Sequence, residues 1–182
     1  AGGFDAFVRG YDAAGNELFT DQSGTSATDF GVDVATDASG RFYLLARTDA
    51  TYPMQTSAGA TDVVVVAYDA NGHPTVTRQF GTSGTDTALA LAATPAGVTY
   101  VVGATNGTFP TLTYGGGPHD GFLATLDASL VVTSVRTVAS SGDDVAVDVA
   151  YDPRGRVVVA GNTGGTLDGQ ASDENWWKWK GG

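Results

Sequence analysis

The sequence contains no cysteine among its 182 residues. This absence excludes disulfide scaffolds, thiolate metal sites and thiol nucleophiles. Basic residues are also few, because 9 Lys and Arg stand against 20 Asp and Glu, for a formal charge of −11. Phosphate backbones and anionic lipid headgroups repel a chain this acidic, so we expect no nucleic-acid partner and no membrane-surface partner.

Long apolar runs and helix-forming residues are missing as well. No stretch approaches the roughly 20 apolar residues that cross a bilayer, so we expect no membrane insertion and a soluble protein. The chain opens on Ala1, and we expect it to be processed or cut from a longer protein. It has only two Glu and two Lys but 26 Gly, a composition that favours short strands joined by tight turns over helices.

What the sequence does contain is a repeat. Three segments align without a gap over 44 positions, and they begin at Asp5, Asp62 and Asp120, spaced by 57 and 58 residues. The aligned positions share their residue types throughout the unit, as in Asp29, Asp86 and Asp144, in Gly40, Gly97 and Gly155, and in Thr48, Thr105 and Thr163. The chain is therefore three copies of one unit of about 57 residues.

Each unit shows four short runs of β-branched and aromatic residues separated by turn signals, which predict strands. In the first unit the predicted strands are about Asp5–Tyr11, Glu17–Gln22, Phe30–Thr36 and Arg41–Arg47. The pattern Asp-x-x-Gly, typical of a type I turn, occurs at 12–15, 37–40, 69–72 and 152–155. The equivalent segments 94–97 and 127–130 each lack one of the two residues, so we expect less regular turns there.

A four-stranded antiparallel unit repeated every 40–60 residues is typical of a β-propeller blade. We therefore predict an all-β protein with three four-stranded blades at 1–57, 58–115 and 116–171, followed by a Trp/Lys-rich tail at 172–182. Closed propellers usually have four to eight blades. We therefore expect a homo-oligomer, either a closed dimer of six blades or a filament, or a chain that is part of a longer propeller.

Four strings carry a likeness to a known family: GFDAFV at 3–8, YDAAGN at 11–16, QFGTSGTD at 79–86 and VGAT at 102–105. They resemble the SBBP-type (seven-bladed β-propeller) repeat of bacterial and archaeal secreted or surface proteins. The resemblance covers the chain up to about residue 170. It implies a secreted or cell-surface location, and it brings no shared catalytic motif.

The tail differs abruptly from the repeat, because it holds every Trp and every Lys of the chain: Trp176, Trp177, Lys178, Trp179 and Lys180. Trp177 follows Asp120 by 57 residues and so falls where the first strand of a fourth blade should begin. One interpretation is a closing strand with tryptophans on one face and lysines on the other. The other is an appended element unrelated to the repeat. We expect the tryptophans to form an interaction site rather than fill a core.

Most aspartates stand at repeating positions, which indicates a structural role as caps of backbone N–H groups in turns. We predict no cofactor. Calcium is the alternative, with Asp143, Asp144 and Asp148 as candidate ligands and with 69–72 copying the start of an EF-hand loop. His73 and His119 have no second ligand at metal spacing, so we expect ordinary loop histidines.

Catalytic motifs are missing too, since neither Gly-x-Ser-x-Gly nor Ser-x-x-Lys occurs and no Gly-rich phosphate loop precedes a helix. We predict a non-enzymatic extracellular structural or binding module that self-associates through blade edges and its Trp-rich strand. The alternative is a carbohydrate-binding propeller with one shallow site per blade, in which the sugar contacts would be Tyr52, Phe109 and Tyr114. A propeller enzyme ranks last, because the sequence shows only turn carboxylates.

Overall fold

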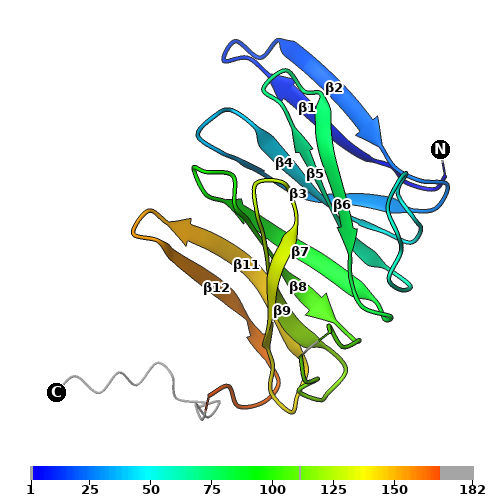
Figure 1. The fold of residues 1–182 in the computed structure, drawn as a ribbon, viewed down its shortest axis with the longest axis vertical. Helices are drawn as coiled ribbons and strands as arrows, with labels where there is room; N and C mark the ends of the chain where they lie inside the picture. The colour runs from blue at the N-terminus through cyan, green and yellow to red at the C-terminus, as the bar shows by residue number, and fades with distance from the viewer. Residues whose placement is uncertain (1, 111, 169–182) are drawn as a thin grey trace.

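The computed structural model describes residues 2–110 and 112–168, and all regular structure in this part of the chain is antiparallel strand (Figure 1). The strands are β1 (Ala6–Tyr11), β2 (Glu17–Ser23), β3 (Asp29–Thr36), β4 (Phe42–Thr48), β5 (Asp62–Tyr68), β6 (Pro74–Phe80), β7 (Asp86–Ala93), β8 (Thr99–Thr105), β9 (Asp120–Leu126), β10 (Val132–Val138), β11 (Asp144–Asp152) and β12 (Arg156–Thr163). The all-β prediction is confirmed, and the strands of the first unit lie within a residue of their predicted bounds. None of the described residues belongs to a helix that could cross a membrane.

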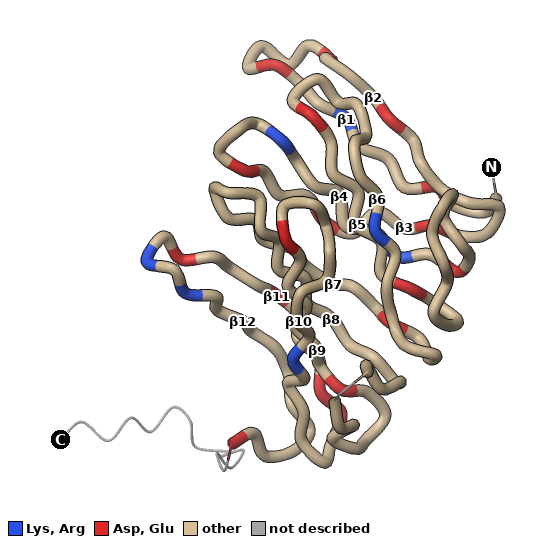
Figure 2. Tube along the Cα trace, in the orientation of Figure 1, with Lys and Arg blue, Asp and Glu red and all other residues tan. Residues whose placement is uncertain are grey.

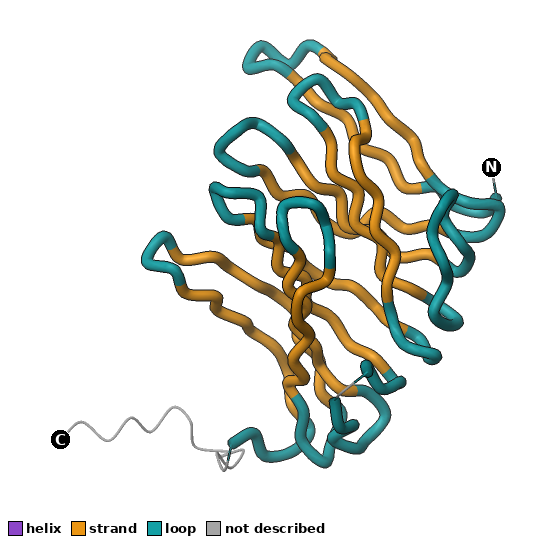
Figure 3. The backbone as a smooth tube through the Cα atoms, in the orientation of Figure 1, coloured by secondary structure: helices purple, strands orange, loops and turns teal. Residues whose placement is uncertain are grey.

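The strands form four sheets that stack face to face in chain order (Figure 1). They are an N-terminal hairpin (β1–β2), a first four-stranded sheet (β3–β4–β5–β6), a second four-stranded sheet (β7–β8–β9–β10) and a C-terminal hairpin (β11–β12). None of them closes on itself. Turns and loops gather at the two ends of the strands (Figure 3).

The sheets are out of phase with the sequence repeat, so the boundaries between the predicted blades 1–57, 58–115 and 116–171 fall inside the two four-stranded sheets. Each four-stranded sheet joins the last two strands of one repeat to the first two strands of the next. The short connection 24–28 leads from one sheet to another, whereas the long connection 49–61 stays inside a sheet. As a result, both described ends of the chain carry a two-stranded hairpin instead of a complete sheet.

Three apolar layers lie between the four sheets. Ala6 and Val8 of the N-terminal hairpin pack against the face of the first sheet that carries Val64. The opposite face of that sheet, with Val63, packs against Phe122 of the second sheet. The third layer joins the second sheet to the C-terminal hairpin, through Ala90, Val102, Ala146 and Val149. The central strand β5 is consequently apolar and buried on both faces, as the run Val63–Val66 shows in the sequence.

The hairpin turns share one geometry. Gly15, Gly40, Gly72 and Gly155 all have φ between 84° and 87°, and each donates its N–H to the carbonyl of the Asp three residues earlier. The two turns expected to be less regular are not, because Gly97 donates to Thr94 and Leu130 donates to Asp127 in the same way. Leu130 adopts a φ of 59° there, and its fully buried side chain holds it in this conformation.

Candidate functional site

The two terminal hairpins are the features that set this fold apart from a run of complete sheets. Inside the first four-stranded sheet, β4 pairs with β5 from Phe42–Tyr68 to Thr48–Asp62. Inside the second, β8 pairs with β9 in the same register. By their position in the repeat, β12 corresponds to β4 and β8, and β1 corresponds to β5 and β9. Within residues 2–110 and 112–168, the matching edges of β12 and β1 have no strand partner.

Side chains on the outer face of β1 are exposed, although their repeat equivalents are buried between two sheets. Phe7 is 65% exposed, while the residues at the same repeat position, Val64 and Phe122, are fully buried. Tyr11 is 59% exposed, while its equivalent Tyr68 is fully buried. Exposed large apolar side chains that are contiguous on a surface are typical of an interaction site. The outer face of the N-terminal hairpin therefore has the chemistry of an internal junction, but no sheet of the described residues covers it.

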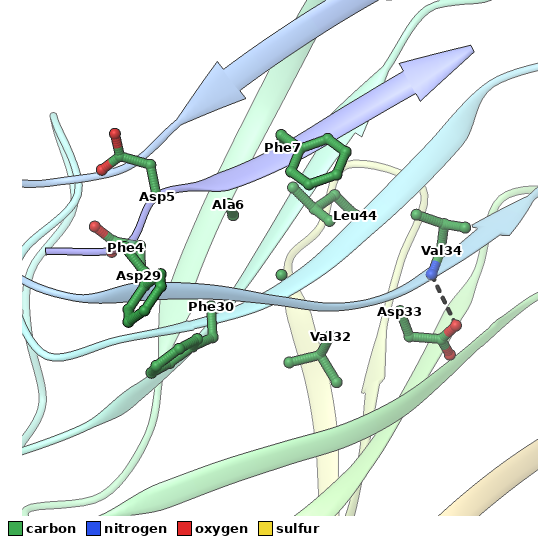
Figure 4. Close-up of a pocket in the computed structure, with 11 residues that line it drawn as sticks. Phe4, Asp5, Ala6, Phe7, Asp29, Phe30, Val32, Asp33, Val34 and Leu44 are labelled. Carbon is green, nitrogen blue, oxygen red and sulfur yellow. Dashed lines mark hydrogen bonds between the residues drawn. The ribbon is translucent and has the colours of Figure 1, made fainter. Parts of the chain in front are cut away.

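A groove of about 420 Å³ extends this exposed face between β1 and β3 (Figure 4). The ring of Phe4 stacks on that of Phe30 at a centroid distance of 5.3 Å, and the guanidinium of Arg47 lies 4.8 Å from the Phe30 ring centroid. Phe7 and Val34 line the other part of the groove. We call the surface formed by Phe4, Phe7, Tyr11, Phe30 and Val34 the N-terminal open face.

The groove is open because no strand of the described residues lies beyond β1 in the N-terminal hairpin. Along the centre of the stack, β3 packs against β7 and β7 packs against β11. Strand β3 is the first in this series. Among the described residues, no strand equivalent to β7 or β11 covers the other face of β3. The groove is thus the uncovered inner half of the first four-stranded sheet.

The opposite end of the stack is open in the complementary way. Val158 on β12 is 54% exposed, whereas its repeat equivalent Tyr43 is fully buried against the second sheet. Val147 on β11 is also exposed. Leu123, on the outer half of the second sheet, is only partly buried, although its equivalent Val65 is fully buried. We call the surface formed by Val147, Val158 and Leu123 the C-terminal open face.

Two of the three predicted sugar-contact aromatics, Tyr52 and Phe109, lie in the core. Tyr52 and Phe109 are about 5% exposed. Tyr52 donates its backbone N–H to the side-chain oxygen of Gln79, and Phe109 meets the ring of Phe122 edge-on at 5.4 Å. Rings held in this way offer no face to a sugar. Tyr114 is half-buried and donates its hydroxyl to the carbonyl of Gly117.

The candidate calcium ligands do not converge. Asp144 is buried and accepts hydrogen bonds from the backbone N–H and the hydroxyl of Ser140, while Asp143 lies 2.9 Å from Nδ1 of His119. Asp148 accepts the N–H of Val149. In the part of the chain that the structure describes, no group of three or more His, Cys, Asp or Glu could hold a metal.

The geometry of Asp144 recurs in every repeat. Asp29 accepts from Thr25 and Asp86 accepts from Thr82, in each case through the backbone N–H and the hydroxyl. Burial opposes ionisation of Asp144, but hydrogen bonds from Thr163 and Ser140 outweigh it and hold the pKa of Asp144 below its ordinary value. These carboxylates close the loops that lead from one sheet to the next.

The sequence did not reveal that the buried aspartates come close together in pairs. A Cβ added to Gly81 would lie 2.5 Å from Oδ2 of Asp86 and 2.7 Å from Oδ1 of Asp62. Asp62 accepts from the Gln79 amide through Oδ2, and its Oδ1 is buried without a hydrogen bond. Burial, with the nearby charge of Asp62 as a smaller cause, raises the pKa of Asp86.

Acidic residues elsewhere lie mainly at turns and strand ends (Figure 2). They leave the middle of the open edges free of negative charge, since residues 157–163 of β12 carry no charge and the only charged residue of β1 is Arg9. The predicted Trp/Lys interface, Trp176, Trp177, Lys178, Trp179 and Lys180, lies outside the described residues.

The open faces could be found only after the strand order was known, because their residues are ordinary strand residues in sequence.

The chain matches no protein-family model, and no curated protein matches its sequence.

Proposed function

We propose that this protein is a non-enzymatic structural and binding module that self-associates through the open edges of its sheet stack. One observation carries this proposal: equivalent residues are fully buried at the internal sheet junctions and exposed at the ends, as with Val64, Phe122 and Phe7. An exposed strand edge is a template for pairing with another chain. The Trp-rich segment 176–180 is a second contact in this proposal, on the strength of its sequence.

A β-propeller is the assembly that this arrangement supports best. The described residues supply two complete four-stranded sheets and two halves, which together make three blades. Two chains would supply six blades, within the range of closed propellers, and a contact that fails to close would produce a filament. A secreted or cell-surface location belongs to the same proposal and rests on the resemblance to the SBBP-type repeat.

The experiment that tests the proposed function is the mass in solution. Light scattering at micromolar concentration should show a species of at least twice the 18.5 kDa chain mass. Dilution should shift the population toward the single chain, because association depends on concentration. A well-folded monomer at all accessible concentrations would contradict the proposal.

A further inference from the structure

We infer that the partner at each open end is a second copy of this chain, whose β1–β2 hairpin completes the sheet begun by β11–β12. This inference rests on the proposed function and specifies its contact. In it, β12 of one copy pairs antiparallel with β1 of the next. The register runs from Thr163 opposite Asp5 to Val157 opposite Tyr11.

The register follows from the two internal examples. Strands β4 and β5 pair from Thr48–Asp62 to Phe42–Tyr68, and β8 and β9 pair from Thr105–Asp120 to Thr99–Leu126. Both pairings contain seven residues on each strand and no bulge. Moving the same register to the equivalent positions of β12 and β1 gives the proposed pairs without any shift.

One pair of residues supports a match between these two edges. In β8–β9, Gly103 lies opposite Phe122, and a Cβ on Gly103 would lie 3.0 Å from Cε1 of that ring as well as against the carbonyl of Thr87. In the proposed pairing, Gly161 lies opposite Phe7. The β12 edge therefore carries a glycine at the position where the β1 edge carries a phenylalanine, as in the second sheet.

The open faces complement each other beyond the edges. In the internal junction, Tyr43 belongs to the same apolar cluster as Leu91, and their equivalents are Val158 and Val34. Strand pairing between copies would bring Val147 and Val158 of one copy onto the groove lined by Phe30 and Val34 of the next. At the same time, the incoming β1–β2 hairpin would cover Leu123. In the internal junction, β9 covers the equivalent residue Val65 in the same way.

Charge allows this contact. The seven residues of β12 in the proposed pairing carry no charge, and among their proposed partners 5–11 only Asp5 and Arg9 are charged. Each copy nevertheless has a net charge of −11, so the two copies repel one another at long range. The contact must therefore come from strand pairing and apolar burial, and added salt should strengthen it by screening the repulsion.

Segment 177–182 of the same chain competes for the β12 edge, since Trp177 stands where the next repeat would place its first strand. Its residues do not follow the repeat, however, whereas β1 has the repeat's Asp-x-Phe at 5–7. The second copy is therefore the better match. Pairing of segment 177–182 with the β12 edge is an alternative outcome of the test.

Disulfide trapping tests the register directly, because the chain contains no cysteine of its own. Arg9 and Val159 lie opposite each other in the proposed pairing, and directly paired residues of antiparallel strands have Cα separations that a disulfide can bridge. Mixing the single variants Arg9→Cys and Val159→Cys under mild oxidation should give a covalent dimer. The matched control replaces Val159→Cys by Ala160→Cys, which moves the thiol to the other face of the strand.

The expected result is about tenfold more covalent dimer from the Arg9→Cys and Val159→Cys mixture than from the control mixture. Equal yields from the two mixtures, in a protein that light scattering shows to self-associate, would overturn this inference and leave the proposed function standing. A monomer by light scattering would overturn both. A double variant, Val159→Cys with Gly181→Cys, probes the tail, and a disulfide within one chain would also overturn the inference.

Discussion

The internal strand β9 and the terminal strand β1 occupy equivalent positions in the repeat, yet their surroundings are opposite. Phe122 and Phe7 occupy the same repeat position, and one is fully buried while the other is 65% exposed. The difference arises from the neighbours and not from the residues themselves. It teaches that the burial of a residue in a stack of repeats depends on both adjacent units.

The largest expected effect compares these two phenylalanines. Phe122→Ala should lower the free energy of unfolding by about 3–5 kcal/mol, because it removes a buried ring and leaves a cavity. Phe7→Ala should cost less than about 1 kcal/mol in dilute protein, since most of that ring is exposed. Urea denaturation at low protein concentration measures both. Equal losses would show that the two positions have the same environment in the single chain.

The next effect concerns association. Phe7→Asp places a charge in the proposed junction, and burying an unpaired charge should weaken self-association by about 100-fold or more. Sedimentation velocity over a concentration series measures this change. The matched control is Leu18→Asp, because Leu18 is 64% exposed and its repeat equivalents Thr75 and Thr133 are exposed in the complete sheets as well. A similar loss with both variants would indicate a general effect of charge.

A smaller effect separates two glycines that share a turn position. Gly15 and Gly72 both have φ near 86°, but a Cβ on Gly15 would meet nothing within 4 Å, whereas one on Gly72 would lie 2.3 Å from Cγ of Phe19. Gly15→Ala should cost about 1 kcal/mol for the backbone conformation alone. Gly72→Ala should cost about 1–3 kcal/mol more through overpacking. Thermal denaturation compares the two variants, and equal costs would show that Phe19 moves aside freely.

The smallest effect compares Asp12, at the tip of a hairpin, with Asp86, which is buried between strands. Hydrogen bonds from the Asn16 side chain and backbone lower the pKa of Asp12, so Asp12 stabilises the fold above its ordinary pKa of about 3.9 and loses this effect as the pH falls. Burial raises the pKa of Asp86, so its contribution is present at low pH and is lost as the pH rises through the raised pKa. Asp12→Asn and Asp86→Asn should therefore change the melting temperature relative to wild type with opposite pH trends between pH 3 and 7. Parallel trends would contradict these pKa directions.

Much of the fold could be predicted because its signals are local. The strand runs and the Asp-x-x-Gly turns lie within a few residues of chain, and the structure confirms both. Even the Thr94–Gly97 and Asp127–Leu130 turns keep the common geometry, since the strands on either side hold them in place. The candidate site was not predictable in this way, because Tyr52 and Phe109 look like accessible loop aromatics until the loops fold back onto the sheets.

The sequence alone determined the repeat, the strand positions, the turns and the all-β class, because periodicity and turn chemistry act over short distances. Only the tertiary structure decided which four strands form a sheet. A strand has two edges, and β4 pairs with β3 before it and with β5 after it. The spacing of a continuous repeat therefore does not indicate at which strand a sheet begins. Packing of both faces of each sheet against its neighbours selects the phase, and in that phase one edge of β1 and one edge of β12 have no strand partner among the described residues.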